Sequence, residues 1–310
     1  MNAKVDSLCS DNEAEPLPGT AKRGSVYVLF EWPGAWSHDV LDGGTLGEEL
    51  SAKIKAHLQK WDASLLLIRH PTRQGRQIKD HHLYVVFTDI GLTEVKHVDS
   101  AEEILELDLG GPGRNGAMAR MAPLALICTH AKRDRCCAIK GRPLIMEMER
   151  RYPFHEGRDV VWETSHIKGH RFAATLILMP WGYSFGRMNL EATEAMLADA
   201  MRGTFFVPGN RGRGIFSPPA QAAEIAVASS LAGEGHKLEY GQLSVDEEHS
   251  ADGCATVVLR DRSADRRFRV RLEQREISGI VSSCGDEPKT GKSWEAVEVS
   301  QDEGQAQSRD

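Results

Sequence analysis

The sequence predicts an α/β protein built from two main units, and three observations support this prediction. Short β-branched and aromatic runs of strand length alternate with segments whose apolar residues recur at helical spacing. The chain has 310 residues, of which 41% are hydrophobic and 27% charged, so it is long enough for two domains of ordinary globular composition. A glycine-rich stretch at residues 110–116 separates the two patterns and is the expected boundary between the units.

The first unit is predicted over residues 23–115, after a polar segment at residues 1–22 that we expect to be flexible. A helix should begin at Thr45, which opens a T-x-x-E capping box with Glu48. Strand composition predicts strands at residues 25–30, 65–68 and 82–87. A short apolar repeat predicts another helix at residues 101–107. The order strand, helix, strand, strand is the beginning of an α/β layer.

The second unit is predicted over residues 120–233. Its first strand ends on Cys128, and α/β sheets usually place their chemistry at the carboxyl ends of strands. Pro143 suits the first position of the following helix, where its missing N–H is not needed. Strands are then expected at residues 160–163, 172–179 and 183–188, and helices at residues 189–203 and 218–231.

The last third of the chain contains a glycine-rich loop, a segment with strand-like alternation and an acidic tail. A basic glycine loop at residues 209–214 either docks an acidic group or forms a solvated turn, and the turn is the simpler interpretation. Apolar and charged residues alternate after residue 234, which predicts a small β-rich addition over residues 234–285. Acidic and polar composition predicts disorder over residues 286–310.

Charge and hydropathy exclude several classes of function. The formal net charge of −7 disfavours general nucleic-acid binding, which requires a basic face. Runs of about 18 apolar residues are absent from the sequence, so no membrane span is predicted. The polar N-terminus lacks the apolar core of a secretory signal, and we therefore expect a cytoplasmic protein.

Cysteine and histidine residues gather between positions 128 and 170. Cys128 and Cys137 form a C-x8-C pair, and His166 and His170 form an H-x3-H pair that should point both imidazoles the same way. Thiolates combined with imidazoles suit zinc or a 2Fe-2S cluster with mixed ligands. Because side chains of successive residues diverge, only one of Cys136 and Cys137 should be a ligand of this site.

Several residues around the predicted site have a supporting role in this interpretation. His130 follows Cys128 as in the first box of a Rieske site, but no second Cys-x-x-His box exists, so we place His130 behind the ligands or at the surface. Five basic residues either provide solubility or offset cluster charge and receive an acidic redox partner. They are Lys132, Arg133, Arg135, Lys168 and Arg171.

These motifs carry a resemblance to a known family. The sequence contains C-T-H-A-K-R-D-R-C-C, S-H-I-K-G-H-R-F, E-W-P-G-A-W near residue 31 and Q-A-A-E near residue 221. With these motifs it resembles the sucrase/ferredoxin-like family and its thioredoxin-like ferredoxins. The resemblance fits the thioredoxin-like order of strands and helices expected in the second unit, while the similar order in the first half predicts two such units, followed by the small β-rich C-terminal addition. The resemblance also implies one 2Fe-2S cluster held by Cys128, Cys137, His166 and His170, and it favours Cys137 over Cys136.

We therefore expect an electron-transfer protein that exchanges single electrons with an unidentified redox partner. A zinc-stabilised binding module and a thiol-based redox protein are the alternatives, although the sequence has no C-x-x-C motif for thiol chemistry. Sucrase activity has no support, because no carboxylate pair stands out. The remaining cysteines, Cys9, Cys254 and Cys284, are expected to be packed thiols rather than a second metal site.

Overall fold

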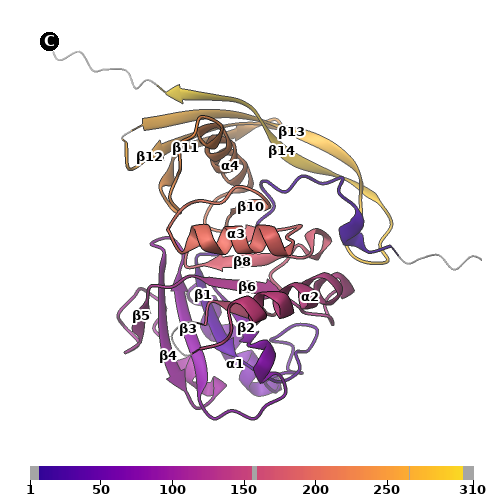
Figure 1. Ribbon diagram of the computed structural model, residues 1–310, viewed down its shortest axis with the longest axis vertical. Coiled ribbons are helices and arrows are strands. Elements are labelled where there is room, and N and C mark those ends of the chain that lie inside the picture. The colour runs from indigo at the N-terminus through magenta and orange to yellow at the C-terminus, as the bar shows by residue number, and fades with distance from the viewer. Residues whose placement is uncertain (1–6, 156–158, 265, 303–310) are drawn as a thin grey trace, which may run out of the picture.

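The computed structural model describes residues 7–155, 159–264 and 266–302, and within them the chain forms two β-sheets (Figure 1). The larger sheet has ten strands in the order β10-β9-β8-β6-β7-β2-β1-β3-β4-β5. Its strands are β1 Val26–Glu31, β2 Ala63–Arg69, β3 His81–Phe87, β4 Leu92–Val98, β5 Met118–Arg120, β6 Leu124–Cys128, β7 Val161–Thr164, β8 Leu176–Met179, β9 Tyr183–Phe185 and β10 Asn210–Arg213.

The smaller sheet is antiparallel and contains β11 Leu243–Ala251, β12 Cys254–Asp261, β13 Arg266–Ile280 and β14 Lys289–Asp302. The α-helices are α1 Glu48–Gln59, α2 Arg135–Arg151, α3 Leu190–Ala200 and α4 Pro218–Gly233. Short 3-10 turns lie at η1 Cys9–Asp11, η2 Pro71–Arg73, η3 Ala101–Glu106 and η4 His170–Phe172. The predicted mixed α/β class is confirmed, and none of the described helices is long and apolar enough to cross a membrane.

The ten-stranded sheet contains the same strand order twice. In the first half the order is β2-β1-β3-β4 and in the second half it is β7-β6-β8-β9; each begins with a parallel pair and continues antiparallel. The halves meet where β2 pairs with β7, through Ile68 opposite Thr164 and Arg69 opposite Glu163. The expected two units are therefore joined into one continuous sheet.

Alternating side chains on β6 connect two hydrophobic cores. Leu126 and Cys128 enter the core that the curled sheet encloses, together with Leu29 of β1. Ala125 and Ile127 face the other side, where α2, α3 and α4 join the four-stranded sheet in a second core. Because β6 is buried on both faces, its carboxyl end is held from both sides.

The predicted starts of α1 and α2 were wrong. α1 begins at Glu48, and Thr45 instead accepts a 2.8 Å hydrogen bond from the backbone N of Ser37. α2 begins at Arg135, eight residues before the predicted start, and Pro143 lies inside it. Asp134 explains the early start, because its side chain accepts a hydrogen bond from Cys136 N at 2.9 Å and caps the helix.

The C-terminal prediction was wrong for residues 289–302, which form β14 and pair with β13; residues 303–310 lie outside the described part. Trp294 and Ala296 pack against the core at alternate positions of the strand, and Val299 does so beyond the register shift that follows Ala296. Charged residues between them produced the polar composition that predicted disorder, although a period of two is the pattern of a half-buried strand.

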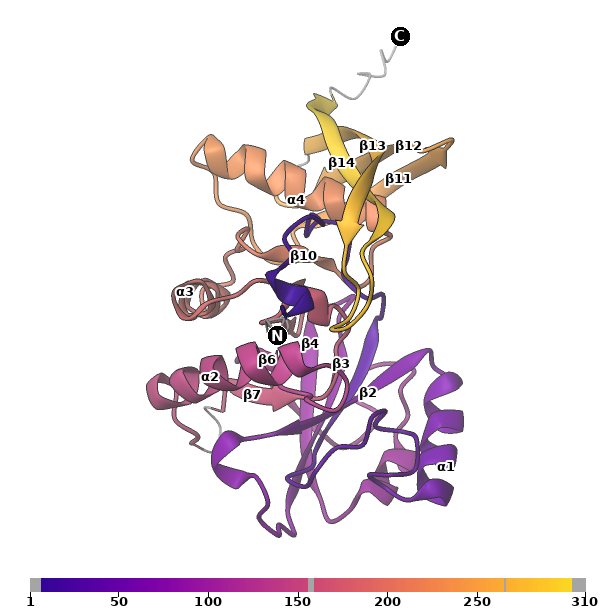
Figure 2. The same ribbon diagram turned by 90° about the vertical axis from the view of Figure 1, so that its right-hand side faces the viewer.

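Two other segments expected at the surface are also packed. Residues 210–213 form β10 rather than a solvated turn, with Arg211 and Arg213 buried. In the described part of the N-terminal segment, Cys9 is buried and Gly19 N donates to Arg211 O at 3.0 Å. Both views show this indigo segment beside the end of the yellow β13–β14 hairpin (Figures 1 and 2).

Candidate metal centre

Two parallel strands end side by side and place the first candidate ligands. Cys128 is the last residue of β6, and in the register of β6 and β7 it lies opposite Thr164. His166 follows β7 by two residues, so it leaves the sheet at the same edge. Ser165 fixes this exit, because its N donates to Leu67 O and its Oγ accepts from Leu67 N at 3.0 Å.

The first turn of α2 brings Cys137 to the same edge. Cys137 N donates to Asp134 O at 3.2 Å, and the helix then crosses the end of β6 at Gly141. A Cβ at Gly141 would lie 2.2 Å from Cys128 O. Only glycine allows the helix and strand to approach this closely, and this approach brings the two thiols together.

The candidate metal centre consists of Cys128, Cys137 and His166. One ligand atom from each residue lies within 4.8 Å of the others, and both cysteines are buried. Neither ring nitrogen of His166 has a hydrogen-bond partner within the described chain. Two buried thiols beside an imidazole with unused nitrogens are a donor set that fits zinc or an iron-sulfur cluster.

A hydrogen bond between the two thiols shifts their pKa values in opposite directions. The bond from Cys137 holds the pKa of the Cys128 thiol well below its ordinary value, and His166 lowers it further. The same bond raises the pKa of Cys137, and burial adds to that effect. Of the two thiols, Cys128 is the one that loses its proton more readily, and the thiolate is the metal-binding form of cysteine.

His170 lies next to the candidate metal centre but outside its tight group. Lys168 and Gly169 have φ values of 67° and 88°, and this left-handed turn returns the chain so that the rings of His166 and His170 are 5.3 Å apart. His170 Nε2 lies 2.8 Å from Ser283 Oγ, whereas its Nδ1 has no partner within the described residues. The expected fourth ligand is thus adjacent, with one nitrogen available.

His130 supports His166 through the backbone. Its Nδ1 accepts a 3.2 Å hydrogen bond from His166 N, so the proton is on Nε2, which donates to Ser37 O at 2.7 Å. Burial lowers the pKa of His130, which favours this neutral form. Both nitrogens are therefore used, and His130 orients the His166 segment instead of offering a ligand.

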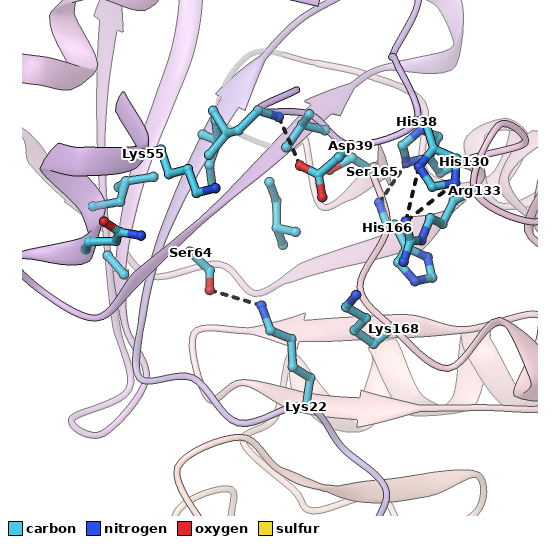
Figure 3. Close-up of a pocket in the computed structure, with 17 residues that line it drawn as sticks. Lys22, His38, Asp39, Lys55, Ser64, His130, Arg133, Ser165, His166 and Lys168 are labelled. Atoms are coloured by element: carbon cyan, nitrogen blue, oxygen red, sulfur yellow. Dashed lines mark hydrogen bonds between the residues drawn. The ribbon is translucent and has the colours of Figure 1, made fainter. Parts of the chain in front are cut away.

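A pocket of 290 Å³ opens beside His166, and cationic side chains surround it (Figure 3). Its charged lining is Lys22, Asp39, Lys55, Arg133 and Lys168. The other basic residues singled out in the sequence lie elsewhere. Lys132 is exposed and lines a different pocket, which also contains Asp134 and Cys284. Arg135 donates to Ser7 O at 3.4 Å, and Arg171 is ion-paired with Glu15.

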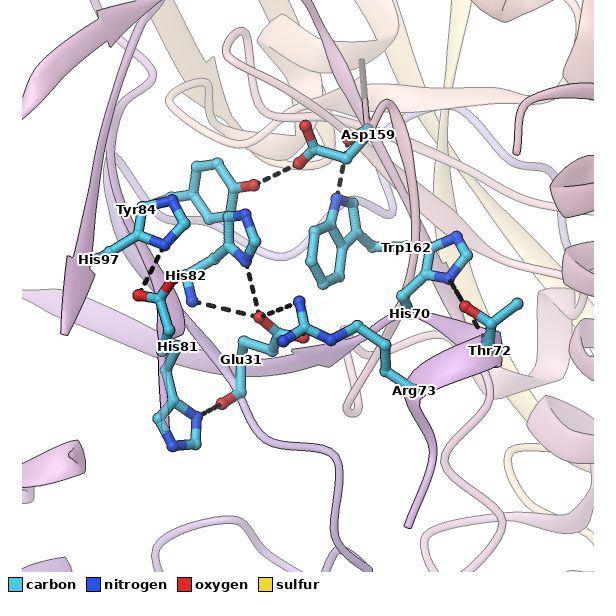
Figure 4. A network of polar contacts seen from close by, with 11 residues as sticks. Glu31, His70, Thr72, Arg73, His81, His82, Tyr84, His97, Asp159 and Trp162 are labelled. Atoms are coloured by element: carbon cyan, nitrogen blue, oxygen red, sulfur yellow. Dashed lines mark hydrogen bonds and ion pairs between the residues drawn. The ribbon is translucent and has the colours of Figure 1, made fainter. Parts of the chain in front are cut away.

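Another polar network joins the two halves of the sheet (Figure 4). Glu31 is fully buried and binds His82 Nδ1 at 2.7 Å and Arg73 Nη1 at 3.1 Å. Asp159 accepts from Tyr84 and pairs with Arg120 at 2.9 Å. Because these carboxylates are ion-paired within the fold, the network resembles a structural element more than a pair of hydrolytic acids.

Cys136 leaves α2 in another direction from Cys137 and contacts Cys9 and Cys284. Sequence reasoning missed this gathering because the three cysteines come from positions 9, 136 and 284, and no spacing rule relates residues so far apart. Cys254 is exposed on β12 and belongs to neither group of cysteines.

A family model described as Sucrase/ferredoxin-like matches residues 17–212, more than half of the chain. The chain belongs to the sucrase/ferredoxin-like family. This membership confirms the resemblance carried by the cysteine and histidine motifs. No curated protein and no solved structure gave a significant match.

The span shared with the sucrase/ferredoxin-like family includes the candidate metal centre and His170. It ends before α4 and the four-stranded sheet, and it begins after η1. Cys9 and Cys284 therefore lie outside the part of the chain that the family model describes.

Proposed function

We propose that the protein is a one-electron carrier whose cofactor is a 2Fe-2S cluster held by Cys128, Cys137, His166 and His170. The observation that carries this proposal is the meeting of two buried thiols with an imidazole whose nitrogens are both unused in the described structure. Membership of a ferredoxin-like family and the adjacent His170 ring, 5.3 Å from His166, add support.

The protein contributes ligands, shielding and orientation to this function. When bound, a 2Fe-2S cluster supplies reversible one-electron chemistry. Cys128 and Cys137 offer sulfur from the water-free side, where they are 1% exposed. His166 lines the cationic pocket and the side chain of His170 is 15% exposed, so the histidine side would be the shorter route to a partner.

The basic pocket supports docking of an acidic redox partner. Lys168 and Arg133 flank His166 in its lining, and like-signed charges in a cleft attract an oppositely charged surface. We propose that a partner protein binds over this pocket, within the cytoplasm. We also propose that each half of the ten-stranded sheet, together with its helix, is a thioredoxin-like unit, because the same strand order occurs in both halves.

Zinc is the second candidate for the same residues. Cys128, Cys137 and His166 lie close enough to one another to surround a single ion, because their ligand atoms are all within 4.8 Å. A tetrahedral zinc would take its fourth ligand from His170 or water. The protein would then be a zinc-stabilised binding module without electron transfer.

Spectroscopy and metal analysis of anaerobically purified protein test the proposal. A 2Fe-2S protein should contain two irons and two sulfides per chain, absorb visible light and give an electron paramagnetic resonance signal after reduction. His166→Ala and Cys137→Ser should each lose or shift this signal, since each removes a ligand. His249→Ala and Cys254→Ser, at exposed positions in the four-stranded sheet, are the matched controls.

Other results would contradict the electron-transfer proposal in distinct ways. A colourless protein with stoichiometric zinc bound by two sulfurs and by imidazole would establish the zinc module. Metal-free protein with titratable Cys128 and Cys137 thiols would instead favour thiol chemistry. A cluster whose spectra are unchanged in His166→Ala would exclude that histidine as a ligand.

A further inference from the structure

A second group of ligand-type side chains lies near the candidate metal centre but shares no residue with it. This thiol cluster consists of Cys9, Cys136, Cys284 and Asp134, whose ligand atoms all lie within 4.8 Å of one another. The sulfurs are separated by 3.4 Å between Cys9 and Cys136, 3.2 Å between Cys136 and Cys284, and 3.6 Å between Cys284 and Cys9.

The carboxylate of Asp134 completes this group. Its Oδ1 is 3.2 Å from Cys284 Sγ, and its Oδ2 is 3.9 Å from Cys9 Sγ. Cys9, Cys136 and Asp134 are buried, whereas Cys284 is partly exposed. Asp134 is held in place by Cys136 N at 2.9 Å and by Cys284 N at 3.0 Å.

These separations are close to those around a single tetrahedral ion. With zinc-sulfur bonds of about 2.3 Å, tetrahedral geometry places sulfurs about 3.8 Å apart, so the thiol cluster would need to expand by only about 0.2 to 0.6 Å. Three sulfurs and one oxygen would close the four-coordinate shell without water, as in structural zinc sites, with Asp134 in the position that Cys or His usually takes. A larger iron-sulfur cluster would require wider spacing.

A disulfide accounts for this group less well. Bonding any two of the three sulfurs would leave the third thiol buried beside the Asp134 carboxylate, whereas a metal ion uses all four groups. Charge around the cluster also favours a metal-thiolate site. The N-terminal turn of α2, which includes Cys136, stabilises thiolates.

We propose that Cys9, Cys136, Cys284 and Asp134 bind one structural zinc ion. The site would join three distant parts of the chain: η1, the start of α2, and the loop between β13 and β14 (Figure 2). It would hold that loop where Ser283 contacts His170 at 2.8 Å, and would thereby close one side of the candidate metal centre. The proposal does not depend on which cofactor the candidate metal centre binds.

Zinc analysis of the full-length protein, purified from zinc-supplemented cells, tests this proposal. We expect one zinc per chain in the wild type and loss of that zinc in the Cys9→Ser/Cys284→Ser variant. Cys254→Ser, which changes an exposed cysteine outside both groups, should retain the zinc. Wild-type levels of zinc in the Cys9→Ser/Cys284→Ser variant would overturn the assignment.

A second set of variants distinguishes the two metal sites. Cys128→Ser/Cys137→Ser should lose whatever the candidate metal centre binds but keep the structural zinc. Conversely, Cys9→Ser/Cys284→Ser should keep iron and sulfide if the candidate metal centre binds a cluster. Failure of the electron-transfer proposal, seen as missing iron, would therefore leave the zinc result unchanged.

X-ray absorption at the zinc edge of the wild type requires no variant to fold. Three sulfurs at about 2.3 Å and one oxygen at about 2.0 Å would support the thiol cluster as the site. Two sulfurs with imidazole scattering would instead assign the zinc to Cys128, Cys137 and histidine, and would overturn the proposal. A Cys136–Cys284 disulfide found by peptide mass analysis of freshly purified protein would also overturn it.

Discussion

Adjacent residues at the start of α2 take part in two different groups of ligands. Cys137 contacts Cys128, whereas Cys136 contacts Cys9 and Cys284. Successive helical side chains diverge by about 100°, so neighbouring cysteines can enter separate sites from one turn of helix. Asp134, which caps this turn, is itself a member of the thiol cluster and lies 3.2 Å from Cys284 Sγ.

His130 should affect the candidate metal centre without being a ligand. His130→Phe keeps an aromatic ring near Trp36 but removes the acceptor for His166 N. We expect about a tenfold faster loss of bound metal to a chelator, the scale typical of residues that orient ligands. The rate is measured by the decay of the visible spectrum or by release of the metal.

The matched control for this prediction is His249→Phe, at an exposed position on β11. Equal rates of metal loss in His130→Phe and wild type would show that the bond to His166 N has no role in holding the site.

Gly141 should be essential for the approach of α2 to β6. Gly141→Ala places a Cβ 2.2 Å from Cys128 O, so the helix must move away from the strand. We expect a net loss of about 1 to 3 kcal/mol in the free energy of unfolding, although alanine is the better helix former by about 1 kcal/mol. Denaturant unfolding measures the change, and metal content should fall with it.

Gly233→Ala is the matched control, because a Cβ at Gly233 of α4 would meet nothing within 4 Å. Its stability should equal or exceed that of the wild type. If Gly141→Ala behaved in the same way, the close packing of α2 on β6 would not determine the position of Cys137.

Individual ligands could be predicted from the sequence, but their relative positions could not. Cys128 and His166 follow short apolar runs, and this local pattern was enough to place both at strand ends. The His166–His170 contact depends on a turn with two positive φ values, one of them at the non-glycine residue Lys168. Propensity alone does not predict such a backbone at lysine.

At the scale of elements, α4 packs a carboxyl group against β9. Glu224 is 1% exposed and accepts a 2.6 Å hydrogen bond from Tyr183 OH, while burial raises the pKa of Glu224 to about 7. The folded state therefore binds this proton more tightly than the unfolded state does. This contribution to stability is complete below pH 4.5 and is lost as the pH rises through about 7.

Glu224→Gln should remove this pH dependence, because glutamine keeps an acceptor for Tyr183 and cannot ionise. A pKa rise from 4.5 to about 7 corresponds to at most about 3 kcal/mol, so the variant should gain up to that amount over wild type between pH 5 and pH 8. Denaturant unfolding at both pH values measures it. An unchanged difference between variant and wild type would mean that Glu224 is ionised in the fold at pH 5.

Elements with strong local patterns were predicted well. Asn189 caps α3 through Ala192 N at 2.8 Å, as expected from its side chain. β4, by contrast, was not predicted, because the charged residues Glu94 and Lys96 interrupt the apolar pattern of Leu92–Val98, which also follows a turn. Pairing with β3 makes it a strand, and pairing partners cannot be identified from one segment alone.

At the scale of the whole molecule, Arg211 links three separate segments. This fully buried side chain donates to Thr20 Oγ1 at 3.0 Å and to Lys168 O at 3.1 Å, and its guanidinium lies 4.9 Å from the centre of the Phe172 ring. Burial lowers its pKa to about 9, so it remains charged near neutral pH. The N-terminal segment, β10 and the His166–His170 loop are thus fastened to one group.

Arg211→Met should destabilise the protein by about 3 kcal/mol, because carbonyl and hydroxyl acceptors would be left buried without donors. Thermal unfolding measures the effect as a lower Tm. Arg23→Met, at an exposed position three residues after Thr20, should leave the Tm nearly unchanged. Equal Tm values for both variants would show that water replaces the lost donor.

The continuity of the sheet is the global property that the sequence did not reveal. The glycine-rich stretch suggested a boundary, yet β5 follows it and pairs with β4, so it leads back to the first half. Only two residue pairs join β2 to β7, and they lie directly before the segment that carries His166. Long-range pairing of this kind depends on the folded chain as a whole and leaves no local pattern.

The contact between His170 and Ser283 has a consequence for how the protein is made. These residues are 113 positions apart, so a ribosome working at about 5 to 20 residues per second needs roughly 6 to 23 seconds to travel from one codon to the other. Cys128, Cys137 and His166 have all been synthesised before that interval begins. A nascent chain could therefore receive a metal through a side that the finished protein keeps covered.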